Sequence, residues 1–284
     1  MSATPRKQLR TWEEAVAILR ADPQHRQLIF DAYLTADLSD NCRRFRTSTE
    51  FDEALALLRK WAPGAQSLLD MPGGNGIATC AFAGVGYDVT AVEPDPSESV
   101  GRGAVVRALA QARLTARVVD GVGEHLPFES GTFDVAYVRQ GLHHAKDLPR
   151  MVEELGRVLR PNGILLACRE HVVDNYGASL QAFLASQVDH QLYGGEHAFT
   201  LADYRKAFSN AALEPILELG PYDSAINTHP NDPASLRMKI LESGPGRILG
   251  MLLPDDTVAS LGVSYLKARR APGRLYSFLL RRPA

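Results

Sequence analysis

The spacing of apolar residues along this chain changes near residue 62. Before that point, segments 11–21 and 48–61 carry apolar side chains at helical intervals, and the first opens on a capping box of Thr11 and Glu14. After it, short apolar runs alternate with helix-patterned segments. This rhythm predicts an α/β fold, in which a parallel sheet carries helices on both faces. The predicted strands lie at 67–71, 89–93, 116–119, 133–138, 164–168, 214–219 and 273–280.

Helical patterns fill most of the intervals between these strands. Asp147 can cap the helix after the fourth strand, and Pro161 with Gly163 ends it. We therefore expect a helical cap at 1–61 and one α/β domain at 62–284, with a lid or substrate region inserted at about 172–271. The predicted helices of the domain lie at 76–83, 97–114, 148–159, 179–188 and 201–213.

Composition narrows the possible partners. A net charge of −2 over 284 residues leaves no basic footprint for a nucleic acid. The three cysteines, Cys42, Cys80 and Cys168, are widely spaced, which indicates a reducing compartment and no disulfide framework. The first fifteen residues lack an apolar signal region, and no run is long enough to cross a membrane. We expect a cytoplasmic protein without a membrane partner.

The stretch "LLDMPGGNGIATCAFAGVGYDVTAVEPD", residues 68–95, combines a strand, a glycine-rich turn, a helix start and a second strand. Such a turn favours an anion or nucleotide ligand, because glycines let the backbone approach and the helix start offers free N–H groups. A phosphate-binding loop would need a Lys after Gly76, and a dinucleotide fingerprint would need a third glycine. Neither is present, nor is the Tyr-x-x-x-Lys pair of short-chain dehydrogenases.

Two acids flank the glycines. Asp70 ends the first predicted strand, and Glu93 ends the second, from where a carboxylate can accept both hydroxyls of a ribose. A carboxylate at Asp70 suits a ligand with an amino group rather than a pyrophosphate. This arrangement fits S-adenosylmethionine better than it fits the other two ligand classes.

Residues 66–169 resemble the class I S-adenosylmethionine-dependent methyltransferases, particularly the ubiquinone/menaquinone-biosynthesis group. The resemblance is carried by four motifs in order: "LLDMPGGNG", "VTAVEPD", "GVGEHLPFESGTFDVAYVRQGLHH" and "ELGRVLRPNGILLA". It implies a Rossmann-like, doubly wound, seven-stranded sheet, mostly parallel with an antiparallel last strand. It also implies S-adenosyl-L-methionine as the cofactor.

The resemblance also implies cofactor-binding residues. Within the motifs these are Asp70, Pro72, Gly74 and Gly76 at the methionine end, Glu93 and Pro94 at the ribose, Gly123 and Glu124 at the adenine, and Arg139 and Gln140 beneath the methionine moiety. Two positions depart from the family pattern. Pro72 replaces the first glycine, which stiffens the turn and removes an N–H. Val122 replaces an acid, so the usual carboxylate contact with the adenine amino group is missing.

Polar residues gather after the fourth and fifth predicted strands, where an open α/β sheet binds its ligands. Transfer of a methyl group to a hydroxyl needs a base, and histidine titrates near neutral pH. Our hypothesis is that His143, His144 or His171 is this base. Packing or capping by one of the paired histidines is the competing interpretation.

The segment "QLYGGEHAFTLADY" interrupts two helical patterns. We predict that it forms a lid on the acceptor pocket, with Tyr193, Glu196 and His197 facing the substrate, as does Glu170; an ordinary helix–helix turn is the alternative. Metal-dependent relatives hold magnesium with an Asp after the fourth strand, where this chain has Arg139. Asp189–His190 and Glu196–His197 offer ligand chemistry, but acid–histidine pairs are common on surfaces, and we expect no metal.

These observations favour a methyltransferase acting on a small molecule, at oxygen before nitrogen or carbon. A protein that binds S-adenosylmethionine without transferring methyl, as a regulator or a non-methylating enzyme, is the second hypothesis. Nucleic acid is not expected as acceptor, because the chain lacks a basic surface. The oligomeric state stays open, with a homodimer among the options.

Overall fold

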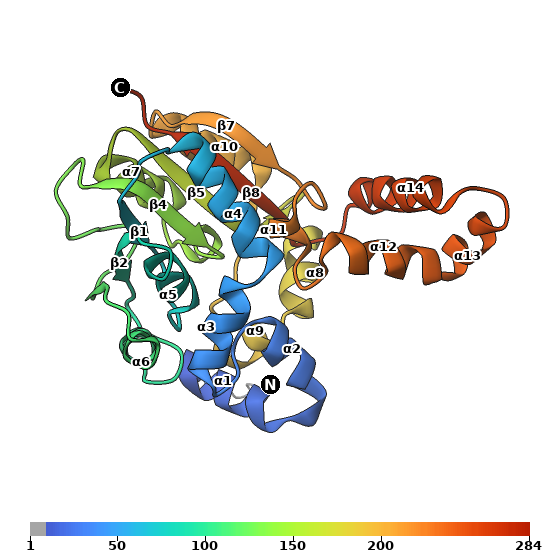
Figure 1. Ribbon diagram of the computed structural model, residues 1–284, viewed down its shortest axis with the longest axis horizontal. Coiled ribbons are helices and arrows are strands. Elements are labelled where there is room, and N and C mark those ends of the chain that lie inside the picture. Colours follow the sequence, from blue (N-terminus) through green and yellow to red (C-terminus); the bar gives the residue numbers. More distant parts are fainter. Residues whose placement is uncertain (1–9) are drawn as a thin grey trace, which may run out of the picture.

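The computed structural model describes residues 10–284, and its centre is one twisted sheet (Figure 1). The order is β3-β2-β1-β4-β5-β8-β7, and β6 pairs with β5 off this path. β8 runs antiparallel to β5 and β7, while the other pairs are parallel. The strands are β1 Ser67–Asp70, β2 Asp88–Val92, β3 Arg117–Val119, β4 Phe133–Arg139, β5 Leu159–Val173, β6 Phe199–Thr200, β7 Glu214–Leu219 and β8 Arg274–Arg281.

The predicted fold class is confirmed, including the antiparallel closing strand. The sheet has eight strands rather than seven, because the two-residue β6 adds to the end of β5. The α-helices are α1 Trp12–Ala21, α2 Arg26–Asp31, α3 Leu38–Arg46, α4 Thr49–Trp61, α5 Ile77–Ala83, α6 Arg102–Ala112, α7 Leu148–Val158, α8 Ala178–Ser186, α9 Val188–Tyr193, α10 Leu201–Asn210, α11 Ala225–Thr228, α12 Pro233–Glu242, α13 Gly244–Gly250 and α14 Asp255–Ala268, with short 3-10 turns η1 Pro23–His25 and η2 Leu142–His144.

Alternate side chains of the central strands build a core on each face of the sheet. Leu68 of β1 belongs to the core that α3, α4, α5 and α6 cover, and Leu69 belongs to the core that α7 and α10 cover. This alternation follows from the two-residue period of a strand. Helices therefore protect both faces, as a mostly parallel sheet requires.

Local sequence signals explain several helix ends. The capping box of Thr11 and Glu14 is present at α1. Asp147 caps α7 by accepting the N–H of Arg150, and α7 ends at Val158. The predicted helix at 97–114 is shorter, Arg102–Ala112, because residues 93–97 have no regular structure, residues 98–100 form a turn and Gly101 is the N-cap.

The fifth strand is much longer than predicted. We expected 164–168, but β5 runs from Leu159 to Val173 because β8 and β6 pair with its end. The pairing of β5 with β8 shifts register between Ala167 and Glu170, and Arg169 has φ +62°. This bulge lies at the carboxyl end of the sheet, where the candidate residues gather.

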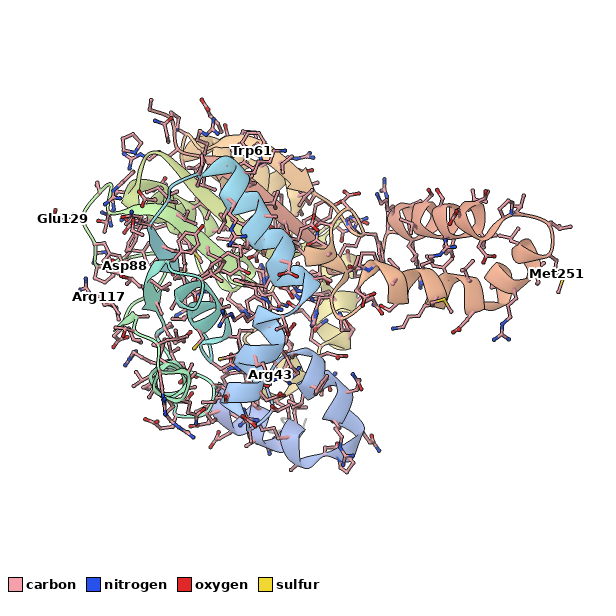
Figure 2. The ribbon with its side chains drawn as sticks, viewed as in Figure 1. Arg43, Trp61, Asp88, Arg117, Glu129 and Met251 are labelled. Carbon is pink, nitrogen blue, oxygen red and sulfur yellow. The ribbon has the colours of Figure 1, made fainter. Side chains whose placement is uncertain are left out.

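The inserted region carries an unexpected arm. α12, α13 and α14 form a helical hairpin that projects from the body (Figure 1). Met251, at the far end of the hairpin (Figure 2), is 81% exposed. Among residues 10–284, no helix is long and apolar enough to cross a membrane. The sequence also led us to expect no signal region in the first fifteen residues. Residues 1–9 of this segment lie outside the part of the chain that the structure describes.

Candidate functional site

The loop after β1 forms a narrow turn against α6. Gly76, at φ +88°, precedes α5, and a Cβ on it would lie 3.0 Å from the Cα of Val105. A side chain is therefore excluded both by conformation and by space. The Gly74 N–H donates to Glu93 Oε2 at 2.7 Å, which links this turn to the end of β2.

Asp70 and Glu93 are both buried at this turn. Asp70 is 1% exposed, and its Oδ2 accepts the Thr79 hydroxyl at 2.6 Å. Oδ1 of Asp70 has no hydrogen-bond partner among the described residues. Burial raises the pKa of Asp70 to about 7, and burial likewise raises the pKa of Glu93 to about 7. Burial therefore disfavours the charged form of both carboxylates, and a cationic or hydroxyl-bearing ligand would reduce this cost.

Pro72, which departs from the family pattern, fits against the loop after β4. A Cβ on Gly141 would lie 2.4 Å from Pro72 Cδ. The proline ring thus takes the space that a side chain at 141 would occupy. The two loops that flank the predicted cofactor position are therefore packed together.

The predicted adenine-side residues lie along the loop between β3 and β4. Gly123 is buried beside Met151, while Val122 is 47% exposed. The Glu124 carboxylate accepts the Lys146 N–H at 2.8 Å, before the start of α7. Glu124 thus fastens this loop to α7 through its side chain. Pro94 is exposed, next to Glu93.

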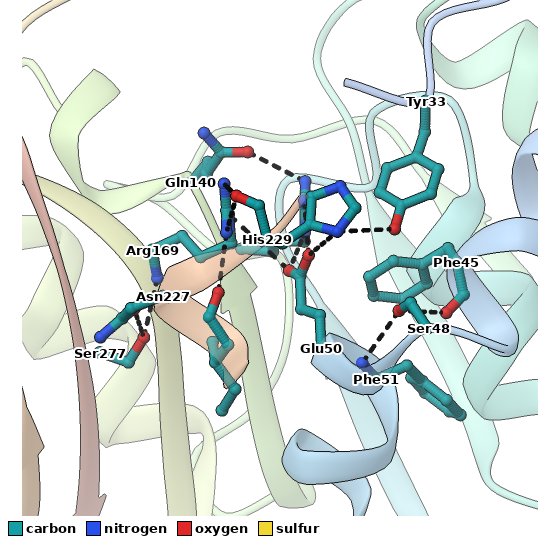
Figure 3. Close-up of polar contacts among 12 residues, drawn as sticks. Tyr33, Phe45, Ser48, Glu50, Phe51, Gln140, Arg169, Asn227, His229 and Ser277 are labelled. Carbon is teal, nitrogen blue, oxygen red and sulfur yellow. Dashed lines mark hydrogen bonds and ion pairs between the residues drawn. The ribbon is translucent and has the colours of Figure 1, made fainter. Parts of the chain in front are cut away.

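A buried ionic cluster lies at the carboxyl end of β4 and at the bulge of β5 (Figure 3). Arg139 donates to Glu50 from Nε at 2.6 Å and from Nη2 at 3.1 Å, and Glu50 is fully buried. Arg169 Nε lies 3.9 Å from Glu50 Oε1, and His229 Nδ1 lies 4.0 Å from Oε2. Burial would raise the pKa of Glu50, but the two guanidinium groups outweigh it and lower that pKa. Arg139 also donates to the Gln140 side chain at 3.0 Å.

Glu170, one residue after Arg169, organises the loop after β4. Its oxygens accept the N–H groups of Gly141 and His143, each at 3.0 Å, and the Nδ1 of His143 lies 2.8 Å from Oε2. Glu170 and His143 are 0% and 1% exposed. These contacts use both carboxylate oxygens, so the geometry gives Glu170 a positioning role behind His143. Its predicted contact with substrate stays a prediction.

The three candidate bases lie together but differ in their surroundings. Burial would lower the pKa of His143, but Glu170 and Glu196 outweigh it and raise that pKa to about 9. His171 donates from Nδ1 to the Gly273 carbonyl at 2.9 Å, and burial with the nearby His143 charge lowers its pKa to about 4. His144 contacts the Gly195 carbonyl through Nδ1 at 3.0 Å, and burial lowers its pKa.

The predicted lid segment lies over these histidines. Glu196 Oε2 is 3.6 Å from His143 Nε2, and Oε1 is 3.8 Å from His144 Nε2. The ring of Tyr193 packs on Gly195, where a Cβ would come within 1.9 Å of it. His197 instead lies against Phe199, with ring centroids 4.7 Å apart. The segment thus brings Glu196 to the histidines, while His197 packs beside them.

Comparison with known proteins identifies a domain family for part of the chain. Residues 69–167 match a family profile described as a methyltransferase domain. An uncharacterized methyltransferase of Mycobacterium sp. (strain JLS) is 36% identical over 102 residues, which are 36% of this chain and 38% of that protein.

Residues 69–167 are a class I methyltransferase domain.

Two further proteins resemble this chain. A ubiquinone/menaquinone biosynthesis C-methyltransferase of Dinoroseobacter shibae is 34% identical over 40% of this chain and 46% of its own length. The chain therefore spans less than half the length of these curated relatives. The crystal structure of the 4+2 cyclase SpnF has a TM-score of 0.55 at 16% identity, over 82% of this chain and 81% of that one. A likeness at this identity concerns the fold alone.

A methyltransferase domain of this class implies S-adenosylmethionine, and the loop after β1 fits that cofactor. The unpartnered Asp70 Oδ1 can accept from an ammonium group, and Glu93 faces the same turn. A Cβ on Gly74 would meet no described atom within 4 Å, so the backbone of the turn is open on that side. Arg139 and Gln140, predicted beneath that part, are held by the Glu50 cluster.

Several residues of the candidate site were not predicted from the sequence. Glu50, Thr79 and His229 were not singled out, although each contacts a predicted residue or its cluster. Glu50 could have been found, because it shares one helical face with Ala54 and Leu58, which are fully buried. An acid on the apolar face of a helix needs a buried partner. His229 carries no such signal, since it reaches the site through the long insertion.

Proposed function

We propose that this protein transfers the methyl group of S-adenosylmethionine to a hydroxyl oxygen of a small molecule. The observation that supports the proposal best is the buried Asp70, whose Oδ1 lacks a hydrogen-bond partner within residues 10–284. An unpaired carboxylate oxygen in the interior is costly unless a ligand pairs with it. The amino group of the cofactor has the charge that this position favours.

S-adenosylmethionine, when bound, supplies a methyl group that its sulfonium has already activated. The chain's own residues then have to hold the reactants in line, exclude water and take the acceptor's proton. Asp70 and Glu93 would hold the amino and ribose groups. The N-terminal helices and the segment around Gly195 would keep water out.

His144 is the histidine whose geometry best suits a base. Its Nδ1 faces the Gly195 carbonyl, which fixes the proton on Nδ1 and leaves a lone pair on Nε2. Its side chain is 34% exposed, so an acceptor can reach it. His143, by contrast, is 1% exposed and has a carboxylate near each ring nitrogen. We therefore assign proton removal to His144, ahead of His143 and His171.

Calorimetry tests the cofactor assignment. The purified chain should bind S-adenosylmethionine and S-adenosylhomocysteine and should not bind NADH. Asp70→Asn should weaken binding of S-adenosylmethionine by about tenfold or more, since a charged hydrogen bond contributes roughly 1.5–3 kcal/mol. Asp88→Asn, at the exposed start of β2, is the matched control and should bind normally. Binding of NADH alone would refute the proposed function.

Turnover tests the reaction. The protein is incubated with methyl-labelled S-adenosylmethionine and a panel of small hydroxylated acceptors, and the labelled product is located by mass spectrometry. His144→Ala should lower the rate by roughly 100-fold, the lower range for a general base. His25→Ala, in the N-terminal cap, should leave it unchanged. Full activity of His144→Ala would remove His144 as the base, and label on nitrogen or carbon would change the acceptor atom.

A second candidate is a protein that binds the cofactor without transferring methyl. It is kept because the 4+2 cyclase SpnF has a similar fold. Tight binding of S-adenosylmethionine, with no label transferred to acceptors of any of the three atom types, would favour this candidate.

A further inference from the structure

The acceptor side of the site contains a group of residues with metal-ligand chemistry. His143, His171 and Glu196 each offer one ligand atom, and these atoms all lie within 4.8 Å of one another. They come from three separate segments: the turn after β4, the end of β5, and the segment between α9 and β6. We expected no metal from the sequence, in which Glu196 stands beside His197 and far from the other two residues.

The separations suit metal ligands better than hydrogen-bond partners. His143 Nε2 lies 3.6 Å from Glu196 Oε2, beyond the usual hydrogen-bond range. Two ligand atoms about 2.1 Å from a tetrahedral zinc ion are separated by about 3.4 Å. Glu196 is nevertheless largely buried, with a side chain 9% exposed. The histidine nitrogens nearest to this carboxylate are 3.6 and 3.8 Å away, so its burial is only partly compensated, and a metal cation between these groups would offset the remaining cost.

Both histidines have the outer contacts that metal ligands usually have. His143 faces Glu170 through Nδ1 at 2.8 Å, and His171 donates from Nδ1 to the Gly273 carbonyl at 2.9 Å. Each contact places the proton on Nδ1 and leaves Nε2 as the donor atom for a metal. Glu170 is itself fixed by two backbone N–H groups, so the first of these contacts is rigid.

We propose that His143, His171 and Glu196 bind one divalent transition-metal ion at the acceptor side of the pocket. Two imidazoles and one carboxylate select zinc, cobalt or iron rather than magnesium or calcium, which prefer oxygen ligands. Three protein ligands leave a coordination position open, as in catalytic zinc sites. An oxygen of the acceptor can fill that position, next to His144. Metal binding itself does not depend on the proposed methyl transfer.

The test uses the full chain, freed of metal with a chelator, and contains neither cofactor nor acceptor. Titration with zinc chloride, followed by calorimetry, should give one site per chain, and magnesium chloride should give none. Cobalt chloride should produce visible absorption bands typical of a four- or five-coordinate ion. Failure of methyl transfer in the earlier assay would leave these measurements unaffected, so the two proposals fail separately.

Variants then locate the ion. His171→Ala and Glu196→Gln should each lower zinc affinity by about 100-fold or more, and Glu170→Gln by about 10- to 100-fold through loss of the outer contact. His25→Ala is the control histidine and should bind zinc as the unmodified chain does. Circular dichroism of the metal-free variants verifies folding, and His171→Gln replaces His171→Ala if the latter unfolds. The proposal is overturned if the unmodified chain binds no zinc, or if folded ligand variants bind it equally well.

Discussion

Arg139 and Glu50, 89 positions apart in the chain, form a bidentate ion pair in which the carboxylate is completely buried. The pair joins α4, in the predicted N-terminal cap, to the end of β4, so this helix contributes directly to the candidate site. Phe45, Phe51 and Leu58 of the same region belong to the core that covers one face of the sheet. Helices α3 and α4 therefore support the sheet as well as cover the site.

Removing one partner of this pair should destabilise the protein. Glu50→Gln leaves two buried guanidinium groups without their carboxylate, and we expect the free energy of unfolding to fall by about 3–5 kcal/mol. Denaturation with urea measures this change. The control is Asp256→Asn, which breaks the Arg237–Asp256 pair, where Asp256 is 93% exposed; it should cost less than about 1 kcal/mol. Equal effects of both substitutions would contradict the role of burial.

Cofactor binding should weaken as the solution becomes acidic. Burial raises the pKa of Asp70 to about 7, so below that pH the free protein carries a proton that an ammonium group must displace. Between pH about 7 and pH about 5.5, affinity for S-adenosylmethionine should fall by up to about tenfold per unit, and above pH 7.5 it should level off.

The matched variant isolates Asp70. Asp70→Asn should bind weakly, and its affinity should change less between pH 7 and pH 5.5, with the remaining slope due to Glu93, whose pKa burial also raises to about 7. Calorimetry in buffers of different ionisation enthalpy would count the protons released. An unchanged slope in Asp70→Asn would show that another group titrates.

Gly195 should not tolerate a side chain. Its Cβ would come within 1.9 Å of the Tyr193 ring, so Gly195→Ala must displace the tyrosine or the segment that carries Glu196. Overpacking of this kind costs about 1–3 kcal/mol. Thermal unfolding and hydrogen exchange over residues 188–198 would record it.

Gly244→Ala is the control for this substitution, because a Cβ there meets no atom of residues 10–284 within 4 Å. It should change stability by less than about 1 kcal/mol. Equal exchange at 188–198 in both variants would argue against the contact between Tyr193 and Gly195.

The first helix should restrain the predicted lid. The ring of Trp12 contacts that of Tyr193, with centroids 5.1 Å apart, and the Arg10 N–H donates to the Leu192 carbonyl. Trp12→Ala should therefore speed hydrogen exchange in α9 several-fold and weaken cofactor binding modestly, while Tyr265→Ala on the hairpin should do neither. Trp12→Ala tests this contact more specifically than a deletion of residues 1–45 would, because the deletion would also remove Tyr33 and Phe45 from the core. Unchanged exchange in Trp12→Ala would mean that α1 does not hold the lid.

The sequence predicted the sheet because its strands carry strong local patterns. Leu68 and Leu69 lie in an apolar run between turn signals, and Asp70 and Glu93 stand at strand ends where parallel strands bring their ends to one edge. The bulge at Arg169 could not be predicted, because it depends on pairing with β8, more than a hundred residues later. The approach of Glu196 to His143 is equally non-local. The hairpin arm was not predicted, because the sequence pattern of its helices does not determine how they pack against one another.

The bulge in β5 also restricts how this chain can change by insertion or deletion. Arg169 points to Glu50, whereas Glu170, the next residue, points to His143 on the opposite side of the strand. A one-residue shift exchanges the two sides of a strand. Loss of a single codon upstream of Arg169 would thus bring Glu170 to the position that faces Glu50, so that two carboxylates would meet there. Substitution can vary this strand one residue at a time, whereas a change of its length upstream of Arg169 would disrupt the Glu50 cluster.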